Sequence, residues 1–156
     1  MQKTGADSIQ VVEATEAERE WCARLMAVLE FWLTLGRTME QSRTILHNPE
    51  YQLFIAHTEG APRGFLLVHR RGVAGSPYIA SLAVAQEAQG RGIGSYLLEF
   101  AEELFRGGAK HIFLCVSSFN SRARSLYERC GYKVVGEFKD YVIEGASEIL
   151  MHKRLS

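Results

Sequence analysis

The sequence predicts a single-domain α/β fold of the α+β class, built around a mixed and mostly antiparallel sheet. Three strand-like apolar runs follow one another at residues 52–57, 64–70 and 78–84, with turn-forming residues between them. The third run leads through a glycine-rich loop into an amphipathic helix, and a fourth apolar run at 111–116 comes after that helix. This strand–helix–strand order predicts that strands 78–84 and 111–116 are parallel neighbours.

The N-terminal part is expected to hold one strand and two helices. Residues 9–13 are rich in β-branched side chains and predict a short first strand. Two capping boxes, each a Thr followed three residues later by Glu or Gln, predict helices that begin at Thr15 and Thr38. The first helix is expected to end near Gly36 and the second before Pro49. The expected apolar face of the first helix consists of Trp21, Leu25, Val28 and Trp32.

The C-terminal part is expected to hold two helices and three strands. The helix after the glycine-rich loop has apolar residues at the spacing of one helical face: Ile93, Leu97, Phe100 and Leu104. Asn120 and Gly131 are suitable capping residues for a second helix between them. Strands at 132–138 and 148–153 follow the strand 111–116 and complete the order β-α-α-β-β-β-α-β-α-β-β.

The length and composition are those of one ordinary globular domain, expected at residues 9–155 after a short extension at 1–8. The 18 basic and 18 acidic residues balance, so no overall charge draws the chain to nucleic acid or to an anionic membrane. No apolar run approaches the ~20 residues of a membrane span. Three cysteines without C-x-x-C spacing favour a reducing cytoplasm, and five scattered histidines give no reason to expect a metal.

The loop Gln89-Gly90-Arg91-Gly92-Ile93-Gly94 is the strongest candidate for a ligand site. It opens a helix, whose first N–H groups have no intrahelical partner and whose dipole favours an anion there. Glycines let a phosphate approach these donors closely. A Walker loop is excluded because Ser95-Tyr96 follows the last glycine, and the G-x-G-x-G spacing differs from a dinucleotide fingerprint. A tight turn without a ligand is the alternative.

Two motifs resemble the GNAT superfamily of N-acetyltransferases. Gln89-x-x-Gly92-x-Gly94 is similar to the acyl-CoA pyrophosphate loop of that family, whose pattern is Arg/Gln-x-x-Gly-x-Gly/Ala. A second segment resembles another motif of the family, and these residues match its positions: Asn120, Ala123, Tyr127, Gly131 and Tyr132. The predicted order of helices and strands also agrees with the family over nearly the whole chain.

The resemblance implies a site for acetyl-CoA, the acyl donor of the family. Its pyrophosphate is expected on main-chain N–H groups between Arg91 and Ser95. Strands 78–84 and 111–116 are expected to splay apart, so that the pantetheine arm pairs with the main chain of 82–84 like an added strand. The implied acetyl-CoA-binding residues are Leu82, Ala83, Val84, Gln89, Gly90, Arg91, Gly92, Ile93, Gly94, Ser95, Asn120, Ala123 and Tyr127.

The implied reaction is direct transfer of the acetyl group from the thioester to a primary amine of a small molecule or a protein. By family position, Tyr127 is the catalytic proton donor to the CoA sulfur, and simple packing of its ring is the alternative. Cys115 stands where many members carry a glutamate base, and a thiol in an apolar strand is a poor base. The alternative roles for Cys115 are core packing and a covalent acetyl-cysteine intermediate. The base is left open among His69, Asp140, Glu144 and Glu148.

The acceptor amine is expected between two segments that line the acceptor groove in this family. They contribute Trp32, Leu33 and Tyr141, whose surfaces suit a small or partly apolar amine or a peptide end. Core packing is the alternative for the linker 31–37. A non-catalytic acyl-CoA-binding module and a nucleotide-phosphate-binding domain are the competing functions. Dimers are common in the superfamily, so a homodimer is among the expected assemblies.

Overall fold

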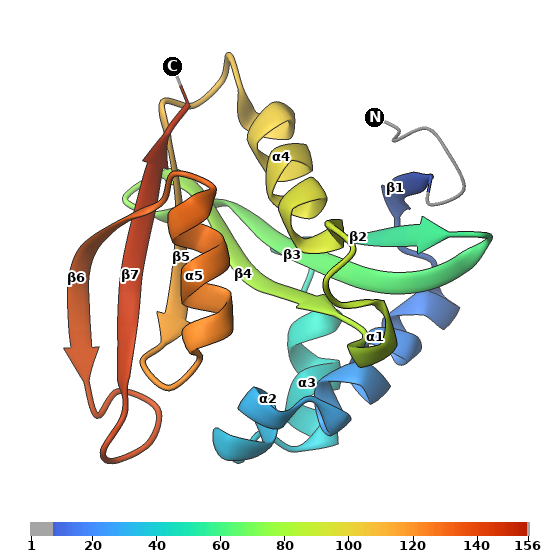
Figure 1. The fold of residues 1–156 in the computed structure, drawn as a ribbon, viewed down its shortest axis with the longest axis horizontal. Helices are drawn as coiled ribbons and strands as arrows, with labels where there is room; N and C mark the ends of the chain where they lie inside the picture. Colours follow the sequence, from blue (N-terminus) through green and yellow to red (C-terminus); the bar gives the residue numbers. More distant parts are fainter. Residues whose placement is uncertain (1–7, 156) are drawn as a thin grey trace.

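A seven-stranded mixed sheet organises the chain, whose computed structural model describes residues 8–155 (Figure 1). The strand order is β1-β2-β3-β4-β5-β7-β6, and every neighbouring pair is antiparallel except β4 and β5. The predicted fold class and the predicted parallel pair are therefore confirmed. The strands are β1 (Ile9–Glu13), β2 (Tyr51–Thr58), β3 (Ala61–Val73), β4 (Ser76–Val84), β5 (His111–Ser117), β6 (Lys133–Lys139) and β7 (Ser147–Arg154).

Helices lie in the connections between strands where the sequence pattern predicted helices. They are α1 (Glu16–Val28), α2 (Glu30–Thr34), α3 (Met39–Leu46), α4 (Ile93–Phe105) and α5 (Ser121–Arg129), with one short 3₁₀ turn at Gln86–Ala88. Both predicted capping boxes are present: the hydroxyl oxygens of Thr15 and Thr38 each accept a hydrogen bond from the third helical N–H. In return, the main-chain N–H of each Thr donates to the side chain of that third residue, Glu18 or Gln41.

The first helix is shorter than predicted, because it breaks at Leu29. The backbone of Leu29 is extended, with φ −76° and ψ 131°, and a separate short helix, α2, begins at Glu30. Val28, predicted for the apolar face, is 68% exposed, whereas Trp32 is buried and its ring stacks on Phe65 with centroids 6.0 Å apart. No Gly or Pro marks the break, so the pattern of the sequence contains no signal for it.

Helices cover both faces of the central strands. α1, α2 and α3 lie on one face, and α4 lies on the other (Figure 1). Trp32 of α2 packs on Phe65 of β3, while Phe100 of α4 meets Phe54 of β2 with ring centroids 4.9 Å apart. Because both faces are covered, residues 64–68 of β3 are all buried and form the centre of the core.

The parallel strands β4 and β5 separate soon after they meet. They pair only at Tyr78 with Phe113 and at Ile79 with Leu114. The register of β4 with β3 also shifts at this point, because Leu67 pairs with Ser81 and Val68 with Ile79 and Ala80 is left as an extra residue. Such a bulge bends a strand and ends regular pairing. The edge of β4 beyond Ile79 is therefore without a partner strand on the β5 side.

Candidate functional site

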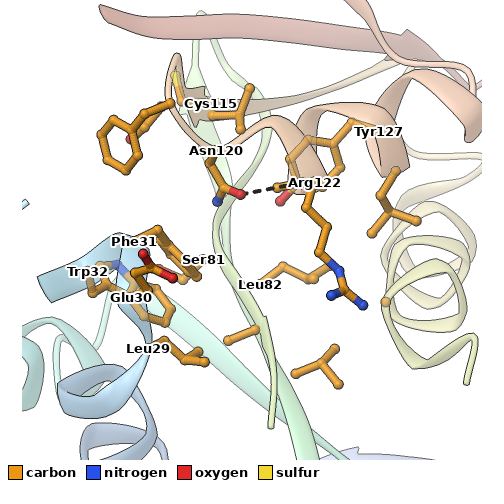
Figure 2. A pocket seen from close by; sticks show the side chains of 18 of the residues that line it. Leu29, Glu30, Phe31, Trp32, Ser81, Leu82, Cys115, Asn120, Arg122 and Tyr127 are labelled. Carbon is orange, nitrogen blue, oxygen red and sulfur yellow. Dashed lines mark hydrogen bonds between the residues drawn. The ribbon is translucent and has the colours of Figure 1, made fainter. Parts of the chain in front are cut away.

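A cleft of about 1220 Å³ lies where β4 and β5 separate. Residues 80–84 of β4 line it, together with α2 on one side and α5 on the other. Figure 2 shows Trp32 and Phe31 of α2 facing the cleft across from Asn120 and Tyr127. The cleft is thus built on an unpaired strand edge, whose main-chain groups can hydrogen-bond a bound molecule.

The glycine-rich loop closes one end of this cleft. Gly90 and Gly92 have φ of 80° and 82°, a left-handed conformation that favours glycine. The side-chain amide of Gln89 donates to the carbonyl of Val84 at 3.2 Å and so ties the loop to the end of β4. The first helical hydrogen bond of α4 is the one that Tyr96 N–H donates to the Gly92 carbonyl. Within residues 8–155, the N–H groups of Ile93, Gly94 and Ser95 therefore point out of the helix start without a main-chain acceptor.

Gly94 has a packing role that differs from that of the other two glycines. A Cβ placed there would lie 2.9 Å from Cδ2 of Leu126 on α5. The absence of a side chain at Gly94 therefore lets α4 and α5 approach one another. Neighbouring Ser95 donates a hydrogen bond from its hydroxyl to the Gly92 carbonyl at 3.1 Å. The loop, the start of α4 and α5 thus form one packed unit beside the cleft.

Helix α5 brings two of the predicted residues to the cleft. The side-chain oxygen of Asn120 accepts a hydrogen bond from Ala123 N–H at 3.3 Å and caps the helix. About two helical turns after Asn120, Tyr127 lines the cleft and is 7% exposed. Burial raises the pKa of Tyr127 to about 12. Its hydroxyl is therefore protonated at neutral pH and can act as a proton donor.

A polar cluster lies where the cleft meets β5 and β7. Ser117 of β5 donates a hydrogen bond to Oε2 of Glu148 on the neighbouring β7 at 2.6 Å. Burial raises the pKa of both the Tyr78 hydroxyl and the Cys115 thiol above their ordinary values, and each of the two groups also affects the pKa of the other. All four side chains line the cleft. At neutral pH, a raised pKa keeps Cys115 as a thiol, which is a poor nucleophile.

Residues 12–132 match the family model described as the acetyltransferase (GNAT) family, and this match covers more than half of the chain. The chain belongs to the GNAT family. A relative within it, the 5-NmdU N-acetyltransferase of Pseudomonas phage PaMx11, is 34% identical over 85 residues. These residues are 54% of this chain and 59% of that relative, so the match spans less than two thirds of the relative's length.

Solved structures of GNAT proteins have the same fold. A GNAT-family structure from Desulfovibrio desulfuricans superposes with a TM-score of 0.80 at 17% identity and covers 95% of this chain and 99% of its own. An aminoglycoside 6′-N-acetyltransferase complexed with coenzyme A gives a TM-score of 0.72 at 16% identity, with 94% and 97% covered. At such identities the similarity establishes the fold of this GNAT chain.

The residues expected at the acceptor end of this GNAT fold are only partly brought together. Tyr141, in the β6–β7 loop, lines the cleft and is 71% exposed. Trp32 reaches the cleft but is 5% exposed, because most of its ring packs on the core. Leu33 is 58% exposed and lies outside the cleft lining. At the other end, the side chain of Arg91 is exposed and also lies outside the lining.

Tyr78, Arg122 and Arg37 are among the cleft residues of the GNAT chain that were not predicted from the sequence. Tyr78 is inside an apolar run, where it had the pattern of core. Arg122 follows the predicted helix cap by two positions, and Figure 2 shows its side chain reaching from α5 into the cleft on the side of Leu82. Arg37 comes from the linker between α2 and α3 and carries no local signal. Each needed the fold to reveal its position.

Residues 8–155 contain neither a candidate metal site nor a helix suited to crossing a membrane. No three His, Cys, Asp or Glu side chains in this range gather in the arrangement of a metal site. None of the helices in the same range combines the length and the apolar character that crossing a membrane requires.

Proposed function

We propose that the protein is an acetyl-CoA-dependent N-acetyltransferase that acts on a primary amine. The observation that carries this proposal is the end of β4–β5 pairing at Ile79 and Leu114, which opens a cleft along a free strand edge. That edge leads directly to the left-handed glycines and free N–H groups at the start of α4. A long ligand with a phosphate at one end and amides along its length fits this sequence of features.

The chain's own residues fit acetyl-CoA. The N–H groups of Ile93, Gly94 and Ser95 suit a pyrophosphate, because unpaired amides at a helix start bind anions. The main chain of 82–84 suits the pantetheine amides. Arg122 adds a positive charge to the same wall of the cleft. The coenzyme A reported in the aminoglycoside acetyltransferase, which has the same fold, supports this assignment.

Bound acetyl-CoA would supply an acetyl group activated as a thioester. The amine nitrogen forms the new C–N bond as the C–S bond breaks, so the sulfur must gain a proton and the nitrogen must lose one. Tyr127 is the proposed donor to the sulfur, since it lines the cleft and its hydroxyl carries its proton at neutral pH. Cys115 is not assigned a covalent step, because burial raises the pKa of its thiol.

Glu148 is the proposed acceptor of the amine proton. Among the four side chains left open by the sequence, Glu148 alone lines the cleft. Asp140 instead accepts the Gly145 N–H at 2.7 Å, and His69 accepts the Arg71 N–H at 3.0 Å. A carboxylate at the acceptor end attracts an ammonium ion and can take its proton directly or through water.

The test is release of CoA thiol with a panel of primary amines, with acetyl-CoA binding measured in parallel by calorimetry. Thiol release that depends on an amine, with the acetylated product seen by mass spectrometry, supports the proposal. Binding of acetyl-CoA without thiol release from any amine would favour the non-catalytic module instead. Failure to bind acetyl-CoA, or equal competition by ATP, would overturn both readings.

A further inference from the structure

Arg37 is a cationic side chain in the cleft wall, and none of residues 8–155 serves it as a hydrogen-bond or ion-pair partner. Its guanidinium is half-buried, and within residues 8–155 it makes no hydrogen bond and no ion pair. Burial lowers the pKa of Arg37, and the charge of Glu148 acts in the opposite direction. A charged group that leaves water without a partner costs free energy. A bound anion would remove that cost.

Glu148 does not serve as that partner. Its carboxylate is held by the Ser117 hydroxyl at 2.6 Å, and it forms no ion pair with Arg37 although its charge influences the arginine. The same carboxylate charge also influences Tyr78 and Cys115, which line the cleft beside it. Within the cleft lining, Glu148 and Arg37 are thus an anion and a cation that are near each other but form no ion pair.

The phosphates of CoA are also unsuitable partners for Arg37. The glycine-rich loop follows the C-terminal end of β4, after Val84. Arg37 instead lies within electrostatic range of Tyr78, near the N-terminal end of β4, where β5 still pairs with it. Arg122 and Arg37 therefore face different parts of a bound donor and acceptor.

We propose that the acceptor is a zwitterion, whose ammonium group lies at Glu148 and whose carboxylate or similar anion lies at Arg37. A guanidinium binds a carboxylate through two parallel hydrogen bonds, which gives orientation as well as affinity. Free amino acids and their analogues are the matching class, because their amine and acid are a few bonds apart. This inference rests on the proposed N-acetyltransferase function and names the acceptor of that same site.

The experiment compares acceptors that differ only by a carboxylate: L-phenylalanine with phenethylamine, L-leucine with isopentylamine, and γ-aminobutyrate with propylamine. The wild type is expected to prefer the acid in at least one pair by 10- to 100-fold in kcat/KM, which corresponds to about 1.4–2.7 kcal/mol. Arg37→Met should abolish that preference, and Arg37→Lys should keep part of it. The control Arg24→Met, which removes an exposed arginine outside the cleft, should keep all of it.

Two results would overturn the inference while the acetyltransferase function stands. One is thiol release with the neutral member of every pair at least as fast as with the acid. The other is an acid preference that survives in Arg37→Met. If no amine releases thiol, binding of N-acetyl-L-phenylalanine and N-acetylphenethylamine is measured in the presence of CoA. Tighter binding of the acid that Arg37→Met abolishes would then support the anion site, and equal binding of the two would reject it.

Discussion

Ser117 donates its hydroxyl proton to Oε2 of Glu148 at 2.6 Å, across the antiparallel pair β5 and β7. This bond joins the strand that borders the cleft to the carboxylate that we assign to the amine. A second bond of the same kind occurs nearby, where Ser147 donates to Oε1 of Glu137 at 2.6 Å. Glu137 lies outside the cleft lining. The two glutamates therefore form a matched pair for experiment.

Glu148→Gln should lower kcat/KM for the amine by about 10²–10⁴-fold at neutral pH, because an amide cannot accept the proton. The difference in kcat/KM between the variant and the wild type should decrease as pH rises, since more of the amine is then neutral in solution. Acetyl-CoA affinity should stay near that of the wild type. The pH dependence of thiol release and calorimetry measure these quantities. Glu137→Gln is the control, and an equal loss in both variants would contradict the assignment.

Tyr127→Phe should lower turnover by about 10²–10⁴-fold and leave acetyl-CoA binding largely intact. Because burial raises the pKa of Tyr127 to about 12, its proton is present throughout the neutral range. Any loss of activity between pH 7 and 9 should therefore come from another group and persist in the variant. Tyr96→Phe is the control, since the Tyr96 hydroxyl is buried without a hydrogen-bond partner among residues 8–155. Wild-type turnover in Tyr127→Phe would mean that the Tyr127 ring serves only for packing.

The fold could be predicted from the sequence because its signals are local. Apolar runs bounded by turn residues marked the strands, and Thr15 and Thr38 marked two helix starts. The break at Leu29 left no local signal, because it accompanies the packing of Trp32 on β3. Tertiary contacts decide such positions, and a sequence pattern does not contain them.

The two ends of the cleft also differ in how far their residues could be predicted from the sequence. The glycine loop and Asn120 are neighbours in sequence to the helices they start, so their positions followed from local rules. The acceptor end instead combines Arg37, Ser117 and Glu148 from three segments far apart in the chain. Only the strand pairing and the α2–α3 linker bring them together. Leu33 is close to Arg37 in sequence but lies outside the cleft lining. Nearness in sequence therefore does not decide which side chains reach the cleft.

Gly90→Ala should weaken acetyl-CoA binding beyond its effect on stability. Gly90 has φ 80° with open space around its Cβ position, and it lines the cleft. Gly107, just after α4, has φ 90° and equally open surroundings but lies outside the cleft lining. Each alanine should cost about 1–2 kcal/mol of unfolding free energy through left-handed strain. Denaturation and calorimetry together test this, and equal CoA affinity in both variants would argue against phosphate contact at the loop.

Lys153→Met should lower the free energy of unfolding far more than the loss of an exposed ion pair does. Lys153 donates to Oε1 of Glu102 at 2.8 Å, and Tyr132 donates to Oε2 at 3.1 Å, while Glu102 is 3% exposed. Removing the lysine leaves a buried carboxylate without its cation, which typically costs about 3–5 kcal/mol. Arg124→Met, which breaks an exposed pair with Glu128, should cost about 0.5 kcal/mol or less. Urea denaturation measures both, and adding Glu102→Gln to Lys153→Met should recover part of the loss, because the uncompensated charge is then gone. No recovery would mean that the lysine acts through its apolar stem on the Tyr132 ring.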